Sequence, residues 1–273
     1  MTLDISLRQR AIPDGSMRYF AWLYTPAEHR DAIAALFLLE SELRDTARVP
    51  HDVAHMRLQW WRDEIERLNN GKAQHPATQT LQSAKNATTD YSMLERLVLC
   101  CAQDIAHSTY ETDSELQQYF SNYGSLATAT ASLLNGSPSV QVMEAAQKLG
   151  AFVREVETLR DLKLDVHHGY LYLPLDELDK LNVEYEVLAS DNWPAGFTDW
   201  LVNRCKSVLQ THKALIQALL GTEKAQLRPL IVLATLHERL LELLISNPDN
   251  FKHRAELGTL KKTWTAWKAA RHS

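Results

Sequence analysis

Apolar residues recur every three or four positions along nearly the whole chain, and no segment of convincing length alternates apolar and polar residues as a strand does. Glycine and proline number 9 each in 273 residues, which is about 3% apiece against roughly 7% and 5% in average proteins. A chain with so few turn-forming residues is expected to build long helices and few hairpins. The sequence therefore predicts an all-α protein, a single domain over residues 1–273 in which about eight helices surround a central space.

Start and stop signals divide the chain into these helices. Thr25-Pro26 is a favourable beginning for a helix, and Asn135-Gly136 is a favourable end. Residues 72–89 are expected to form a connection with at most a short helix, and residues 170–174 an extended segment, because Pro174 disfavours helical backbone before it. The predicted helices are 27–48, 52–69, 90–107, 114–135, 139–167, 200–220, 227–246 and 257–271, with a short turn at 176–181.

Composition excludes several functional classes. A net charge of −5 without a basic domain argues against nucleic-acid binding. Cys100 and Cys101 are neighbours and poorly placed to bridge, and Cys205 stands alone, so reduced thiols in a reducing compartment are expected. The first residues show no secretion signal, and the longest apolar run, 32–39, is far too short to span a bilayer. We expect a soluble, cytoplasmic protein, with a peripheral membrane contact left open.

Three carboxylates mark the predicted helix 139–167. Glu157, Asp161 and Asp165 are spaced at i, i+4 and i+8 and therefore share one helix face. Carboxylates on an inward face would suit magnesium, which bridges hard oxygen ligands to substrate phosphates. Acidic faces are also common on surface helices, so spacing alone favours a solvated face with local partners in Arg160 and Lys163.

The segment around these carboxylates resembles a known motif. Residues 159–174, LRDLKLDVHHGYLYLP, resemble the second aspartate-rich motif of the squalene/phytoene synthase family. Asp161 and Asp165 fall on its two aspartates, and His167-His168 replace its usual basic pair. Glu157 stands where the family usually has an Asn that helps to hold magnesium, and Arg154 stands where it usually has Gln.

The resemblance extends over most of the chain. It includes Arg18-Tyr19-Phe20, the stretch RLQWWR at 57–62 and FKHRAELGTLKK at 251–262. It implies the all-helical isoprenoid synthase fold, a single cavity between two aspartate-rich helices, and magnesium (Mg2+) as the cofactor that holds the diphosphate of a prenyl substrate.

The first aspartate-rich motif is altered. Its five residues align with RDTAR at 44–48, so that Arg44 and Arg48 replace the two terminal aspartates and Asp45 remains inside. Arginine has no lone pair to offer a metal ion. The two arginines could grip a diphosphate through bidentate hydrogen bonds, cross the cavity to pair with the acidic stripe, or face water.

Two functional hypotheses follow from this resemblance. The first is a divergent magnesium-dependent prenyltransferase that binds prenyl diphosphates and joins them head to head. The second is a catalytically silent scaffold with a protein partner, because one branch of the family lacks the full motifs, keeps Glu42-Leu43 and includes a mitochondrial assembly factor of respiratory complex I. The residues that the enzyme would use are Asp161, Asp165 and Tyr172 for catalysis, Arg44, Asp45, Arg48 and Arg160 for substrate, and Glu157, Asp161 and Asp165 for metal, with Tyr172 facing the reacting carbons.

The C-terminal segment is basic and carries two tryptophans. Trp264 and Trp267 are spaced at i, i+3 among lysines and arginines. Such a segment usually packs its tryptophan face on the helical bundle, which is the expectation here. Contact with a membrane surface is the alternative.

Overall fold

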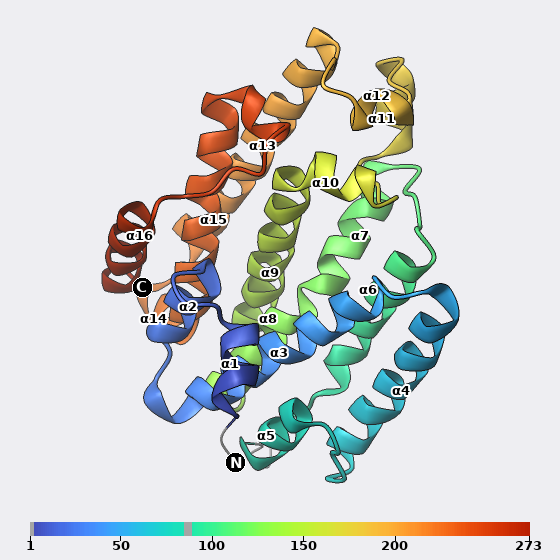
Figure 1. The fold of residues 1–273 in the computed structure, drawn as a ribbon. Coiled ribbons are helices and arrows are strands. Elements are labelled where there is room, and N and C mark those ends of the chain that lie inside the picture. The colour runs from blue at the N-terminus through green and yellow to red at the C-terminus, as the bar shows by residue number, and fades with distance from the viewer. Residues whose placement is uncertain (1–2, 85–88) are drawn as a thin grey trace.

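The computed structural model describes residues 3–84 and 89–273. Within these ranges every regular element is a helix, and β-type pairing is limited to an isolated bridge between Tyr110 and Pro174, which confirms the all-α prediction (Figure 1). The α-helices are α1 (Ile5–Ala11), α2 (Met17–Leu23), α3 (Arg30–Thr46), α4 (His51–Asn69), α5 (Pro76–Ala84), α6 (Glu95–Ile105), α7 (Asp113–Tyr123), α8 (Ser125–Asn135), α9 (Val140–Arg160), α10 (Leu162–His167), α11 (Leu175–Lys180), α12 (Tyr185–Ala189), α13 (Ala195–Ala218), α14 (Gly221–Gln226), α15 (Arg228–Ser246) and α16 (Thr259–Arg271), with 3-10 turns at Ala27–His29, Ser92–Leu94 and Pro248–Phe251.

Local capping explains where several of these helices begin and end. The side chains of Ser16, Thr112 and Ser139 accept hydrogen bonds from the first turns of α2, α7 and α9, which satisfies backbone N–H groups that have no partner inside the helix. Gly136 follows α8 and Gly169 follows α10, both with positive φ angles that glycine adopts without strain. The helices therefore end at these two glycines, as the sequence predicts.

Helix α9 lies at the centre of the molecule and packs against α7, α8, α13 and α15 (Figure 1). The single helix predicted for 114–135 is wrong, because the segment is divided at Gly124 into α7 and α8. Helix α9 passes close to this point. A Cβ atom on Gly124 would lie 2.4 Å from the carbonyl oxygen of Gln147 in α9. Only glycine leaves room for the two backbones at this crossing.

Other predicted boundaries also need correction. The helix predicted for 139–167 is interrupted at Asp161, where α9 ends and α10 begins. Ile5–Ala11 and Met17–Leu23, for which no helix was expected, form α1 and α2, which pack on α3 and α15. Asp4 caps α1 by accepting a hydrogen bond from the backbone of Ser6, a short-range signal that apolar periodicity does not reveal. Residues 85–88 of the predicted connection lie outside the described residues.

Two large apolar clusters form the core, one built mainly around α3, α4 and α6 and the other around α9, α13 and α15. The three cysteines are buried in these clusters as free thiols, as the sequence predicts. No helix in the described part of the chain is long and apolar enough to cross a membrane.

Candidate functional site

A cavity of about 770 Å³ opens between α3, the α9–α10 junction and the segment that precedes α16. Glu157, Asp161 and Asp165 all line it, so the acidic stripe points inward, as the family resemblance implies and contrary to what spacing alone favours. Basic and acidic side chains face this space in balanced numbers. The basic residues are Arg10, Arg18, Arg44, Arg48, Arg160, Arg254 and Lys262. The acidic residues are Asp14, Glu40, Asp45, Glu157, Asp161, Asp165 and Glu256.

The central contact of the cavity joins α3 to α9. Arg44 Nη1 lies 3.1 Å from Glu157 Oε2, and Arg154 Nη1 lies 3.7 Å from the same oxygen. Only 12% of the Glu157 side chain is exposed. Burial alone would raise the pKa of Glu157, but Arg44, His237 and Arg18 outweigh it and hold the pKa well below its ordinary value. Of the three arrangements that the sequence left open for the two arginines, the structure shows the pairing across the cavity for Arg44.

The second carboxylate of the stripe is also held by arginines. Arg160 Nε donates to Asp161 Oδ1 at 2.7 Å and Arg160 Nη2 to Asp161 Oδ2 at 2.5 Å, a bidentate contact. Arg254, from the segment before α16, places its Nε 3.1 Å from Asp161 Oδ1. Arg160, the residue expected to bind substrate, is thus engaged by its neighbour in the chain.

Asp165 differs from the other two carboxylates. It is half-buried, and no ion pair joins it to any residue that the structure describes. Burial raises its pKa to about 6, an effect that the positive charge of Arg154 opposes and the negative charge of Asp161 reinforces. A carboxyl group with this pKa can gain or lose a proton near neutral pH.

The residues at 44–48, where the sequence resemblance implies the first aspartate-rich motif, are split between two environments. Arg44 points into the cavity, whereas Arg48, one turn later, is exposed at its edge and makes no ion pair with a described residue. Asp45 is bound by Arg10 at 2.6 Å, and the same guanidinium reaches Glu42 at 2.6 Å. Both contacts with Arg10 lie near the surface, since about half of the Arg10 and Asp45 side chains is exposed.

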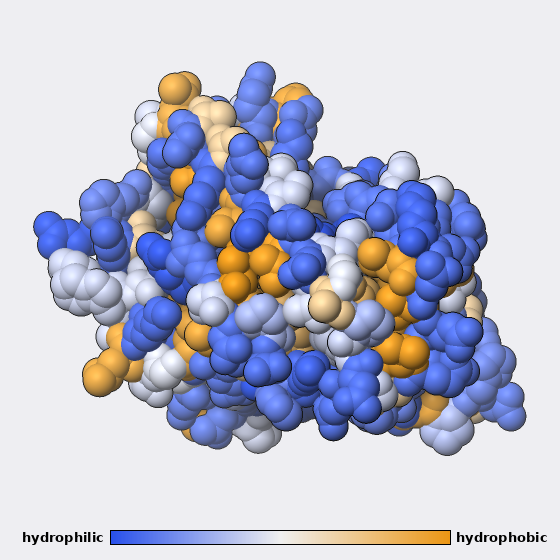
Figure 2. All heavy atoms as spheres, turned by 90° about the horizontal axis from the view of Figure 1, so that it is seen from above, coloured by the Kyte–Doolittle hydropathy of each residue, from blue (hydrophilic) through white to orange (hydrophobic). Residues whose placement is uncertain are grey.

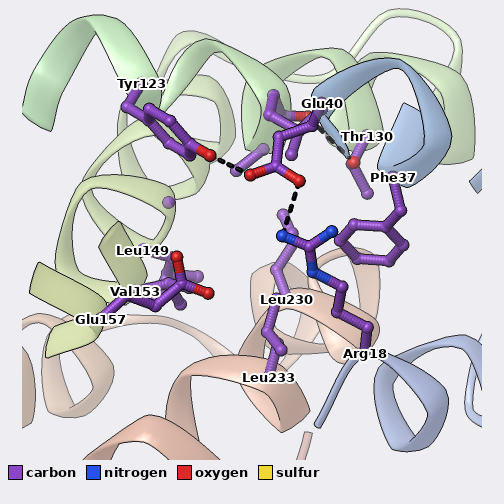
Figure 3. Close-up of a pocket in the computed structure, with 13 residues that line it drawn as sticks. Arg18, Phe37, Glu40, Tyr123, Thr130, Leu149, Val153, Glu157, Leu230 and Leu233 are labelled. Atoms are coloured by element: carbon purple, nitrogen blue, oxygen red, sulfur yellow. Dashed lines mark hydrogen bonds and ion pairs between the residues drawn. The ribbon is translucent and has the colours of Figure 1, made fainter. Parts of the chain in front are cut away.

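Glu40 is a site residue that the sequence reasoning missed. It is fully buried, Arg18 Nη2 lies 2.6 Å from its Oε2, and the Tyr123 hydroxyl donates to its Oε1 (Figure 3). A lone acid at the end of the apolar run 32–39, four residues before Arg44, was the available signal. Glu40, Arg18 and Glu157 are the charged residues that line a small, mostly apolar chamber of about 40 Å³, together with Leu149 and other aliphatic side chains.

Arg154 occupies the centre of an aromatic cluster. Its guanidinium lies 5.8, 4.8 and 5.0 Å from the ring centroids of Tyr119, Tyr123 and Tyr172, and only 3% of the residue is exposed. The hydroxyls of Tyr119 and Tyr172 donate to Asp104 at 3.1 and 2.8 Å. Tyr172, expected to face the reacting carbons, is therefore bound inside this cluster and lines neither of the two spaces.

Solved structures share this architecture. The chain superposes on a dehydrosqualene synthase in complex with ligand with a TM-score of 0.76 and 16% identity, covering 93% of this chain and 90% of the other. A squalene synthase, HpnC from Alicyclobacillus acidocaldarius, gives a TM-score of 0.70 at 16% identity, covering 89% and 95%. The fold is the all-helical isoprenoid synthase fold.

The family follows from sequence comparison. The family model for squalene/phytoene synthase matches residues 14–262, so the chain belongs to the squalene/phytoene synthase family, which links it to isoprenoid biosynthesis. It is 24% identical to the 15-cis-phytoene synthase of Synechocystis sp. over 89% of this chain and 77% of that protein. It is 22% identical to the chloroplastic phytoene synthase of an Oncidium hybrid cultivar, of whose length it spans 62%. The resemblance found in the second motif is confirmed.

The family implies magnesium, and the geometry tests whether these residues fit it. Among residues 3–84 and 89–273, no group of three or more His, Cys, Asp or Glu side chains could hold a metal ion. Glu157 is already bound by Arg44, and Asp161 by Arg160 and Arg254, so guanidinium groups take the oxygens that a cation would need. In this arrangement the predicted set of Glu157, Asp161 and Asp165 does not fit a resident ion.

Proposed function

We propose that this chain is a non-coupling member of its family: it keeps the isoprenoid synthase fold as a scaffold and does not join prenyl diphosphates head to head. The observation that carries the proposal is the ion pair across the cavity, in which Arg44 lies 3.1 Å from Glu157. This pair ties α3 to α9 at the position where the family holds its metal–diphosphate group. A buried carboxylate neutralised by arginine has no need of a metal ion.

Arg154 supports the proposal from the chemistry of the reaction. When diphosphate leaves an allylic carbon, positive charge develops on that carbon. The Arg154 guanidinium already lies against the faces of Tyr119, Tyr123 and Tyr172, the groups that would otherwise stabilise such a charge. A fixed cation at this position also repels a second one, an effect that the low dielectric of the interior strengthens.

The size of the apolar chamber points the same way. Ligand pockets usually enclose roughly 300–1,000 Å³. The chamber under Glu40 encloses about 40 Å³, which is far below that range, whereas the cavity of ligand size is lined by charged groups. A prenyl chain needs a large apolar cavity, whereas here the large cavity is charged and the apolar one is small.

An assay with labelled substrate tests the proposal. Purified protein is incubated with farnesyl or geranylgeranyl diphosphate and magnesium, beside the Synechocystis relative as a positive control, and released diphosphate and hydrocarbon are measured. We expect no product above the blank. We also expect magnesium alone to bind weakly in a calorimetric titration, since the carboxylates are occupied. A hydrocarbon product, or tight binding of several ions to the free protein, would contradict the proposal.

A deletion strain provides the matched test in the cell. Asp165→Asn removes the second aspartate of the family motif but disturbs no ion pair, so the variant is expected to fold. If the role is non-catalytic, this variant rescues the deletion as well as the parent chain does. A variant that is folded and fails to rescue would favour the enzyme.

The second candidate is a prenyl-diphosphate-binding enzyme of unusual mechanism. The observation in its favour is the polar cavity of about 770 Å³, where Arg48 is exposed and free of ion pairs within the described chain. Under this hypothesis Arg48 grips the diphosphate through bidentate hydrogen bonds. Saturable binding of geranylgeranyl diphosphate that Arg48→Ala weakens at least tenfold would support it.

A further inference from the structure

The C-terminal helix α16 presents an unpartnered apolar stripe to solvent. Leu260, Trp264 and Trp267 are 87%, 65% and 40% exposed and lie on one helix face, where the two indole rings stack with centroids 5.0 Å apart. The opposite face is buried, because Ala266 packs between α15 and α2. The expectation that the tryptophans pack on the bundle is therefore wrong: the small residues of α16 take that position, which directs the large ones outward.

Charge accompanies this stripe. Helix α16 contains Lys261, Lys262, Lys268 and Arg271 and no acidic residue, in a chain whose net charge is −5. Lys261, Lys268 and Arg271 are exposed, and the Arg271 guanidinium lies 4.8 Å from the Trp267 ring centroid. On the left of Figure 2, the side on which α16 lies in Figure 1, pale and orange side chains project beyond the hydrophilic surface.

We propose that α16 is an interfacial helix that docks the protein on an anionic lipid surface. Leu260, Trp264 and Trp267 enter the boundary between headgroups and acyl chains, while Lys261 and Lys268 contact lipid phosphates. Helices that lie in a membrane interface combine these features: tryptophan and leucine on one face, lysine and arginine beside it, and modest overall hydrophobicity. The proposal does not depend on whether the cavity is catalytic.

The observations favour lipid over a protein partner. The stripe is convex, since its three side chains stand out from a helix at the edge of the molecule, and a deformable lipid surface accommodates such a shape without a matching groove. The uninterrupted positive charge suits a surface of uniform negative charge. The opposite face of the same helix borders the charged cavity, because Lys262 of α16 and Leu257 before it line that cavity.

Vesicle sedimentation tests the proposal with full-length protein. The probes are phosphatidylcholine vesicles with and without phosphatidylglycerol, in low and high salt. We expect binding to the anionic vesicles only, and loss of binding near 1 M NaCl, where the Debye length falls to about 3 Å. Lys261→Gln with Lys268→Gln should weaken binding roughly 30-fold. Trp264→Ser with Trp267→Ser should weaken it by at least about tenfold.

Matched variants on the opposite side of the molecule serve as controls. Trp60→Ser removes a half-exposed tryptophan of α4, and Arg57→Gln with Lys72→Gln removes the same charge as the lysine pair. The controls should bind vesicles like the parent, and circular dichroism melts should show that the α16 variants remain folded. The proposal is overturned if the parent ignores anionic vesicles, if α16 variants and controls weaken binding equally, or if the stripe instead joins two copies into a dimer that the tryptophan variants dissociate.

Discussion

Helix α3 and the α9–α10 pair face each other across one cavity, and charged side chains of both line it. The α9–α10 side presents Glu157, Asp161 and Asp165, whereas the α3 side presents Arg44 and Arg48, at positions where the sequence resemblance implies aspartates. Arg44 is directed inward and pairs with Glu157, but Arg48 is exposed and makes no ion pair with a described residue. The comparison shows that depth determines what a charge does: a buried charge requires a partner, and an exposed one is solvated by water.

Reversing the charge of α3 should have the largest effect. Arg44→Asp with Arg48→Asp places carboxylates on both sides of the cavity and leaves Glu157 and Glu40 without Arg44, so we expect a loss of roughly 3–5 kcal/mol in the free energy of unfolding. Magnesium with a prenyl diphosphate should restore part of it by binding the folded state. Thermal melts with and without these ligands measure both effects. If the double variant melts at the same temperature as the parent and magnesium does not change its melting temperature, the ion pair across the cavity does not stabilise the protein.

The aromatic cluster behind the cavity should be nearly as sensitive. Arg154→Gln, which introduces the residue typical of the family, removes a buried cation that faces Glu157 and three tyrosines. We expect a loss of about 3 kcal/mol, because Glu157 and Asp104 then lose a compensating charge in the interior. Urea unfolding measures the change. A loss under about 0.5 kcal/mol, typical of surface positions, would mean that the cluster does not depend on the cation.

Asp165 should show an intermediate effect that depends on pH. Because burial raises its pKa from 3.8 to about 6, the folded state binds the proton more tightly than the unfolded state does. The charged form therefore costs stability, and this cost appears as the pH rises from about 4 to about 6 and persists at pH 7. Asp165→Asn should be about 1–2 kcal/mol more stable than the parent at pH 7, after allowance for its partial exposure, and equal to it at pH 3.5.

Unfolding curves of the two proteins at several pH values isolate this group, because the other acids contribute equally to both. The ionised form of Glu157 has the opposite effect on stability. Its lowered pKa stabilises the folded state above pH 4.5, and that contribution disappears as the pH falls through the folded pKa. A constant difference between parent and Asp165→Asn over the whole range would show that Asp165 is solvated.

The exposed charges beside α3, on Arg10 of α1 and on Arg48 after α3, should have the smallest effects. Arg10→Ala breaks exposed contacts with Glu42 and Asp45 and should cost between 0 and about 1 kcal/mol. Arg48→Ala should change the free energy of unfolding by less than about 0.5 kcal/mol. Urea unfolding of both variants beside Arg44→Ala gives the comparison. If Arg48→Ala lowered the free energy of unfolding as much as Arg44→Ala, burial would not explain the difference between the two arginines.

Much of the fold was predictable because it depends on local signals. The periodicity of apolar residues, the caps and the glycines after α8 and α10 predicted most helices, and the motif at 159–174 predicted the family and the inward acidic stripe. The requirement for glycine at position 124 was not predictable in this way, because it depends on the backbone of Gln147 in another helix. The roles of Asp161, Asp165, Tyr172 and Arg160 in substrate or metal binding stay predictions.

The residue pattern alone determined the helical class, the family and the presence of opposite charges at 44–48 and 157–165. The tertiary structure decided which of those charges meet: Arg44, in the last turn of α3, pairs with Glu157, and Arg48, just beyond the end of that helix, does not. It also decided that α16 buries Ala266 and exposes Trp264. The physical reason is that periodicity defines the faces of a helix, whereas burial, and with it the energy of every charge or indole on a face, depends on which neighbours cover it.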